Sequence, residues 1–238
     1  MSEEIDLPGG QINTVVRVGD TVRRTLRWDR AQQHDLLRHL EGVGFEGAPR
    51  FLGLDAEGRE TLTFLPGHVP YDTGGFTDAQ LAAAARLLRR YHDATTGFAP
   101  VREAGAEVMC HNDWTPANTV FADGMPYGMI DFDTAAPGTR LWDLAYSVWT
   151  WLDLGDPDYT GAEQRRRIGL FLAAYGHPDC TLQHVAGYLP TRQAGVVRWA
   201  RQWGMAAGAE WAMNAMEWTL EHVTEQVHLN GRPPIDRP

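Results

Sequence analysis

The first 65 residues carry a hydrophobic pattern that predicts short strands around one helix. Within 9–26, a glycine-opened loop precedes two β-rich runs separated by Gly19–Asp20, which is typical of a hairpin. Residues 30–41 follow the period of an amphipathic helix, and Gly42 is a stop signal. The helical spacing is carried by three leucines, Leu36, Leu37 and Leu40.

Two more strands and a break complete this part of the chain. Residues 50–54 and 60–65 fit short strands joined by a turn, and Pro66–Gly67 then interrupts the pattern. We therefore expect one lobe at 1–67 and a second at 68–238.

The second part is mainly helical and contains one hairpin. Thr77 or Asp78 can cap a helix that runs to about His92. Asp123–Gly124 separates TVFA from MPYGMIDF, and both turn positions tolerate positive φ, so a two-residue hairpin is predicted. From Leu141 onward the pattern is helical. Breaks are expected at three sites, Gly155–Pro157, Gly176–Pro178 and Leu189–Pro190.

Length and composition narrow the class of protein. A chain of 238 residues with 43% hydrophobic content suits one large domain or two small lobes that share a cleft. No apolar run reaches the roughly 20 residues that cross a bilayer, and the N-terminal residues do not look like a secretory leader. We expect a cytoplasmic protein that does not bind membranes. Cys110 and Cys180 are isolated in the sequence, so free thiols are expected rather than a zinc site.

The charge of the chain restricts its partners. A formal net charge of -10 opposes nonspecific binding to nucleic acid and would attract a cationic small molecule. The sequence contains no lysine. Any cation that grips a phosphate must therefore be an arginine, whose planar fork differs from the point charge of lysine.

Polar residues that suit phosphoryl transfer cluster around the predicted hairpin. His111, Asn112 and Asp113 are followed by Asn118, and Asp131 lies on the far side of the hairpin. Phosphoryl transfer needs a carboxylate near the attacking hydroxyl and oxygen ligands that hold Mg²⁺ against the phosphates. Because Mg²⁺ prefers one or two protein oxygens plus water and phosphates, one Asn and one Asp are a reasonable ligand set.

The stretch HNDWTPAN, followed by the hairpin and MIDFDTAAPGTRLWDLAY, resembles the aminoglycoside phosphotransferase and choline kinase-like family. The resemblance implies an α+β, two-lobed, protein-kinase-like fold with a short β-rich N-lobe and a mainly helical C-lobe. It also implies that Asp113 is the catalytic base, that Asn118 and Asp131 bind Mg²⁺, and that His111 shapes the loop. ATP would be the phosphoryl donor.

The N-terminal half extends the resemblance. GGQINTVVRVGDTVRR looks like the nucleotide-covering hairpin of the family, and TFLPG looks like the hinge that meets adenine. By this resemblance the cofactor-binding residues are Gly10, Asn13, Arg24 and Leu65.

Three positions depart from the family pattern. Asn112 stands where the family has Gly, and Asn tolerates left-handed backbone angles. Arg24 takes the place of a phosphate-binding Lys because it shares a strand face with Val22, whereas Arg23 would point away. His34 replaces the Glu that pairs with this Lys. A His beside an Arg cannot form the usual ion pair unless another carboxylate intervenes.

Each candidate residue also has a plainer interpretation. Asp113 can cap a turn, and Asn118 and Asp131 can cap the hairpin. Asp133 either orients Asp131 or ends the strand. Asp143 is expected to anchor the loop through backbone hydrogen bonds.

The expected function is transfer of the γ-phosphoryl group of ATP to a hydroxyl of a small molecule, such as an aminoglycoside or another antibiotic. Acidic residues such as Glu210 and Glu217 would receive a cationic substrate, or form only a solvated face. One alternative is a non-catalytic small-molecule binding or immunity protein on the same fold. A protein kinase is disfavoured because the loop reads His-Asn-Asp and no activation segment is recognisable.

Overall fold

The N-terminal part of the chain is an antiparallel sheet flanked by one helix. The computed structural model describes residues 4–7, 15–26, 28–70 and 75–230. Five strands pair in the order β1-β2-β3-β5-β4. Their bounds are β1 Glu4–Asp6, β2 Val15–Val18, β3 Thr21–Arg24, β4 Phe51–Leu54 and β5 Glu60–Thr63. The sequence predicts four of these strands, and it does not predict β1.

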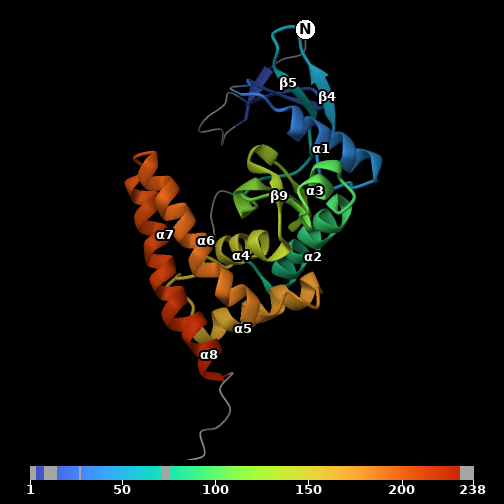
Figure 1. Cartoon of the computed structure of the whole chain (residues 1–238). Helices are drawn as coiled ribbons and strands as arrows, with labels where there is room; N and C mark the ends of the chain where they lie inside the picture. Colours follow the sequence, from blue (N-terminus) through green and yellow to red (C-terminus); the bar gives the residue numbers. More distant parts are fainter. Residues whose placement is uncertain (1–3, 8–14, 27, 71–74, 231–238) are drawn as a thin grey trace, which may run out of the picture.

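Helix α1, Ala31–Gly42, lies beside this sheet (Figure 1) and agrees with the predicted helix. Its three predicted core leucines are all buried. The His34 ring stacks on the ring of Phe51 in β4, with centroids 3.9 Å apart. The stack fixes the direction in which the His34 nitrogens point.

Backbone hydrogen bonds join the β-rich part to the hairpin that follows. His68 and Phe121 exchange two hydrogen bonds, of 3.0 and 2.8 Å between nitrogen and oxygen. The Met129 N–H donates to the carbonyl of Gly47 at 2.7 Å. Gly47 and His68 are therefore both attached to that hairpin through the backbone.

The second part is built of helices around two small two-stranded sheets (Figure 1). The sheets pair β6 Val108–Cys110 with β9 Ala136–Gly138, and β7 Thr119–Ala122 with β8 Met125–Met129. The helices are α2 Asp78–Thr95, α3 Ala99–Glu103, α4 Arg140–Leu152, α5 Gly161–Tyr175, α6 Leu182–Gln202, α7 Ala206–Thr219 and α8 Glu225–Asn230, with a π-helical turn at Leu220–Thr224 before α8. The α+β class predicted from the sequence is confirmed.

Local sequence signals explain where several elements begin and end. Thr77 caps α2 in a reciprocal pair with Gln80. The hairpin turns at Asp123 and Gly124, with φ of 50° and 73°, as the sequence predicts. Gly176 ends α5 in the left-handed conformation.

The predicted break at Leu189–Pro190 is wrong, because α6 continues through Pro190. Proline lacks the N–H that would bond to the carbonyl four residues earlier, which here is the carbonyl of Ala186. The Thr224 hydroxyl donates to that carbonyl at 3.2 Å. A hydrogen bond from the neighbouring π-helical turn thus replaces the missing one.

Among the residues that the structure describes, no helix combines the length and the apolar character that a membrane span requires.

Gly67 provides a test of how tightly the two parts meet. It has a φ of 143°, and an added Cβ would lie 2.2 Å from the carbonyl oxygen of Phe121. We expect Gly67→Ala to lower the free energy of unfolding by about 1–3 kcal/mol through overpacking. Gly97→Ala is the control, because a Cβ there meets nothing within 4 Å. Urea unfolding followed by tryptophan fluorescence measures both, and equal effects would contradict the prediction.

Candidate functional site

The loop after β6 is held by a buried carboxylate. Asp143 of α4 accepts the N–H of His111 at 2.8 Å and that of Asn112 at 2.7 Å. Asn112 has a φ of 65°, in the left-handed region that Asn tolerates. The hydrogen bonds are those expected of Asp143 as an anchor of the loop.

The pKa of Asp143 reflects this role. Burial acts to raise it, but the hydrogen bond from His92 and the backbone N–H of His111 hold the pKa of Asp143 below its ordinary value. Asp143 therefore remains ionised where the loop needs an acceptor. His111 is fully buried, and its Nε2 lies 3.0 Å from the carbonyl oxygen of Ile130. This contact ties the loop to the end of the hairpin, in keeping with a structural His111.

Asp113 lies at the tip of this loop with both carboxylate oxygens engaged. Its Oδ1 accepts from the Tyr146 hydroxyl at 2.8 Å, and its Oδ2 accepts from Asn118 Nδ2 at 3.0 Å. Burial raises the pKa of Asp113, the negative charge of Asp131 adds to the increase, and the two hydrogen bonds oppose it. A carboxylate with a raised pKa is a stronger proton acceptor.

Asn118 and Asp131 mark the two ends of the β7–β8 hairpin. The N–H of Ile130 donates to the carbonyl of Asn118 at 3.0 Å, so the ends lie side by side. The amide nitrogen of Asn118 is directed at Asp113, which leaves its amide oxygen for another partner. The side chain of Asp131 is 43% exposed.

These donors suit a magnesium ion better than a transition metal. Within the described ranges, no group of three or more His, Cys, Asp or Glu side chains could hold a metal ion. One amide oxygen and one carboxylate are the partial, all-oxygen set that Mg²⁺ uses when phosphates and water complete its shell. The residues therefore fit Mg²⁺ held together with a nucleotide.

Asp133 forms ion pairs that neither sequence-based interpretation predicts. It forms ion pairs with two arginines of the N-terminal part, Arg30 and Arg24, the latter at 2.9 Å. Arg30 is 1% exposed, and burial together with the nearby charge of Arg24 lowers the pKa of Arg30 to about 10. Sequence reasoning missed Arg30, since nothing in its spacing shows that it faces an acid about 100 residues away.

Arg24 has three acidic neighbours. Its Nη2 lies 2.7 Å from Glu60 Oε2, and its Nη1 lies 3.2 Å from Asp131 Oδ1 in addition to the contact with Asp133. His34 Nε2 lies 2.9 Å from the other oxygen of Glu60. Glu60 is thus the intervening carboxylate that the sequence requires and does not identify. Arg23 contacts Asp55 instead, in keeping with the opposite face of the strand.

Three other residues are predicted to bind the cofactor, and their role stays a prediction. Gly10 and Asn13 lie outside the described residues. Leu65 packs against Gly128, where an added Cβ would lie 2.9 Å from Leu65 Cδ1. Its part in contacting a nucleotide base remains a prediction.

Two further residues support the loop and were missed from the sequence. Arg192 of α6 donates to the carbonyl of Asn112 at 2.6 Å, and its guanidinium lies 4.4 Å from the centre of the Tyr146 ring. Tyr146 could have been found, because it lies one turn after Asp143 on the same helix. Arg192 could not, since no motif surrounds it.

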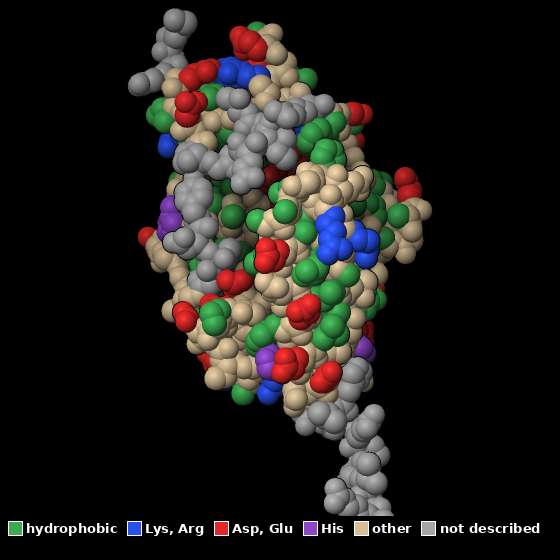
Figure 2. Space-filling model, turned by 90° about the vertical axis from the view of Figure 1, so that its left-hand side faces the viewer, with side chains coloured by type: hydrophobic (Ala, Val, Ile, Leu, Met, Phe, Trp, Pro, Cys, Tyr) green, Lys and Arg blue, Asp and Glu red, His purple; other side chains and the backbone are tan. Residues whose placement is uncertain are grey.

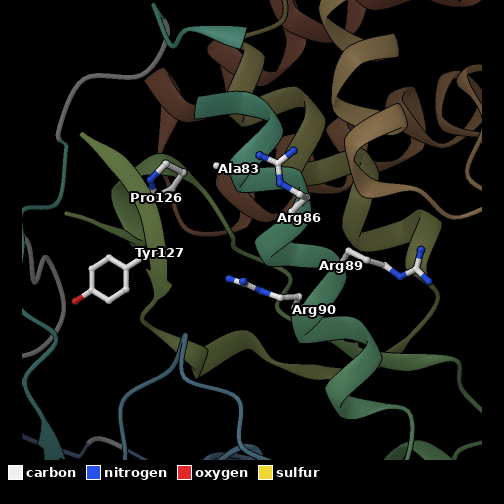
Figure 3. Close-up of a pocket in the computed structure, with 6 residues that line it drawn as sticks. All are labelled: Ala83, Arg86, Arg89, Arg90, Pro126 and Tyr127. Atoms are coloured by element: carbon white, nitrogen blue, oxygen red, sulfur yellow. The ribbon is translucent and has the colours of Figure 1, made fainter. Parts of the chain in front are cut away.

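A surface hollow of about 430 Å³ lies elsewhere, between α2 and β8 (Figure 3). Its lining comprises Ala83, Arg86, Arg89, Arg90, Pro126 and Tyr127. It includes none of the predicted site residues. Arg89 is already bound to Asp93 and to backbone carbonyls. We do not place the chemistry there.

The acids considered for substrate binding lie on α7. Glu210 and Glu217 are exposed. Figure 2 looks onto the side of the molecule where α7 lies and shows acidic side chains spread along it rather than gathered in one cluster. Their role towards a cationic substrate stays a prediction.

Comparison with known proteins agrees with this geometry. The sequence model described as the phosphotransferase enzyme family, APH, matches residues 98–177, which contain the loop, the hairpin and α4. The trifolitoxin immunity protein of Rhizobium leguminosarum bv. trifolii is 35% identical over 184 residues, which cover 71% of this chain and 68% of that protein.

Solved structures share the fold at low sequence identity. An ethanolamine kinase of Plasmodium vivax has a TM-score of 0.67 at 13% identity, with 94% of this chain and 83% of that chain covered. The GDP complex of aminoglycoside 2'-phosphotransferase-IIIa has a TM-score of 0.59 at 14% identity, with 95% and 94% covered. The predicted kinase-like fold is confirmed. From the 35% identity to a relative of which 68% is covered, together with the match to the family model, we conclude that the chain belongs to the phosphotransferase enzyme family.

Proposed function

We propose that the protein transfers the γ-phosphoryl group of ATP to a hydroxyl group of a small molecule. The observation that supports this best is the environment of Asp113, a partly buried carboxylate whose pKa is raised and whose oxygens are fixed by Tyr146 and Asn118. A residue that only caps a turn would not need this environment.

In this proposal Asp113 orients the acceptor hydroxyl and takes its proton as the phosphoryl group moves in line. Asn118 and Asp131 would hold Mg²⁺, which neutralises charge on the phosphates. Arg24 supplies the positive fork that a lysine supplies elsewhere in the family. The ion pair between Arg24 and Asp131 supports this arrangement, because it holds the cation beside one of the proposed metal ligands.

We favour a hydroxyl-bearing antibiotic or toxin as the acceptor. The support is the likeness to an immunity protein and to an aminoglycoside phosphotransferase. The likeness to the immunity protein also supports a second candidate function, that of a non-catalytic protein that protects by binding. The two candidates differ in whether nucleotide is consumed.

The first prediction from this proposed function concerns the catalytic base, Asp113. In a screen of hydroxylated antibiotics and metabolites with ATP, we expect at least one compound to be phosphorylated. Asp113→Asn should lower turnover by about 10²–10⁴-fold, the contribution typical of a general base, while Mg·ATP still binds.

Asp123→Asn is the matched control, because it makes the same exchange at the hairpin turn, where Asn tolerates positive φ. It should leave turnover unchanged. GTP is tested beside ATP, since a structural neighbour holds GDP. Binding of an antibiotic without nucleotide consumption would favour the non-catalytic candidate.

The second prediction concerns pH. Asp113 accepts a proton only when ionised, so activity should rise with pH through its pKa. Because burial raises that pKa, the acidic limb of kcat/KM should lie above the ordinary carboxyl range. Tyr146→Phe removes a hydrogen bond that stabilises the ionised form, so the limb should move to higher pH. Tyr188→Phe, at an exposed tyrosine, should not move it. A limb that stays in place in Tyr146→Phe would contradict the assignment.

The third prediction concerns the metal. In calorimetric titration with Mg·ATP, Asp131→Ala should weaken binding by at least about tenfold, a loss seen even for residues that only support a metal ligand. Asp158→Ala changes an exposed acid and should bind as the native protein does. Equal affinity for Mg·ATP in the native protein and both variants would contradict the assignment of Asp131 as a metal ligand.

A further inference from the structure

The acidic partner of Arg24 lies on the neighbouring strand of the sheet. Arg24 in β3 and Glu60 in β5 are direct partners in the antiparallel register. Glu60 Oε2 accepts from Arg24 Nε at 2.8 Å and lies 2.7 Å from Arg24 Nη2. One edge of the guanidinium fork is therefore fixed on a single carboxylate oxygen.

The second oxygen of Glu60 is also occupied. His34 Nε2 lies 2.9 Å from Glu60 Oε1, and the His34 ring is stacked on Phe51. Glu60 is 0% exposed. A fully buried carboxylate is expensive to keep unless both oxygens are bonded, and here two residues from two elements satisfy it.

The other end of the Arg24 fork points at the candidate metal site. Arg24 Nη1 lies 2.9 Å from Asp133 Oδ1 and 3.2 Å from Asp131 Oδ1. The Arg24 side chain is 12% exposed. Glu60 therefore decides where the remaining donors of Arg24 are directed, and that direction is towards the place where phosphates would meet the metal.

We propose that Glu60 is the positioning residue that orients Arg24 for the phosphates of the nucleotide. By the resemblance to the family, this role would belong to a Glu at the position that His34 occupies. The proposal rests on the proposed function. Because the pair is formed across two hydrogen-bonded strands, its geometry is set by sheet register and does not depend on how α1 docks. His34 contributes from α1 only by holding the far oxygen of Glu60.

Glu60→Gln tests the role with little change in side-chain volume. We expect the Kd of Mg·ATP and the KM for ATP to rise about tenfold or more, because the negative charge that strengthens the hydrogen bonds to Arg24 is lost, while the KM for the acceptor stays unchanged. Glu57→Gln is the control, since it removes an exposed carboxylate from the turn between β4 and β5. A merely structural role would lower stability and leave the ratio of the two KM values as it is.

A double-mutant cycle tests whether Glu60 acts through Arg24. If it does, Glu60→Gln combined with Arg24→Gln should bind Mg·ATP no more weakly than Arg24→Gln alone. Losses that multiply would show that the two residues act independently, and would overturn the proposal.

Moving the carboxylate from position 60 to position 34 tests whether nucleotide binding can be rescued. His34→Glu in the native background sets two carboxylates against each other and should weaken nucleotide binding. In the Glu60→Gln background, the same change returns a carboxylate to the helix position and should recover part of the lost affinity. Failure of this rescue with a folded double variant would contradict the view that Glu60 supplies the charge missing at position 34.

If Glu60→Gln does not fold, Glu60→Asp and Arg24→Lys carry the test. Glu60→Asp keeps the charge and should retain more affinity than Arg24→Lys, which replaces the fork by a point charge and loses the paired contact. The opposite order would overturn the proposal. A native protein that binds no nucleotide would sink the proposed function and this inference together, whereas native binding that Glu60→Gln leaves unchanged would sink the inference alone.

Discussion

The site depends on one buried carboxylate, that of Asp143. It receives the N–H groups of His111 and Asn112, and His92 of α2 lies 2.9 Å from it. Burial, ahead of the opposing influence of Asp143, lowers the pKa of His92, so the imidazole is neutral and its other nitrogen can accept from the Tyr175 hydroxyl at 2.7 Å. Helices far apart in the chain are thus joined at the root of the Asp113 loop.

A second ionic cluster joins the β-rich part to the end of the hairpin. Arg24 and Arg30 face Asp131 and Asp133 across that junction. Two cations and two acids in one partly buried cluster keep the local charge near balance, with Glu60 providing the extra negative charge. In a chain without lysine, this cluster holds an arginine, Arg24, beside the end of the hairpin.

The part of the fold that follows local rules could be predicted from the sequence. The Asp123–Gly124 turn and the cap at Thr77 depend on residues within a few positions of each other. The continuation of α6 through Pro190 could not be foreseen, because it depends on Thr224 from another element. Glu60 was missed for the same reason, since its role follows from the pairing of β3 with β5.

The shape of the Arg24 side chain fits the position of the carboxylate that binds it. A lysine ammonium is a point charge that a carboxylate can approach from many directions, whereas an arginine fork binds best along its planar edge. A residue directly opposite on the next strand presents its oxygen along that edge, and Glu60 does so with contacts to both Nε and Nη2. Once that edge is occupied, a second acid at position 34 would only add repulsion. A ring that stacks on Phe51 and meets the second oxygen of Glu60 suits this position better.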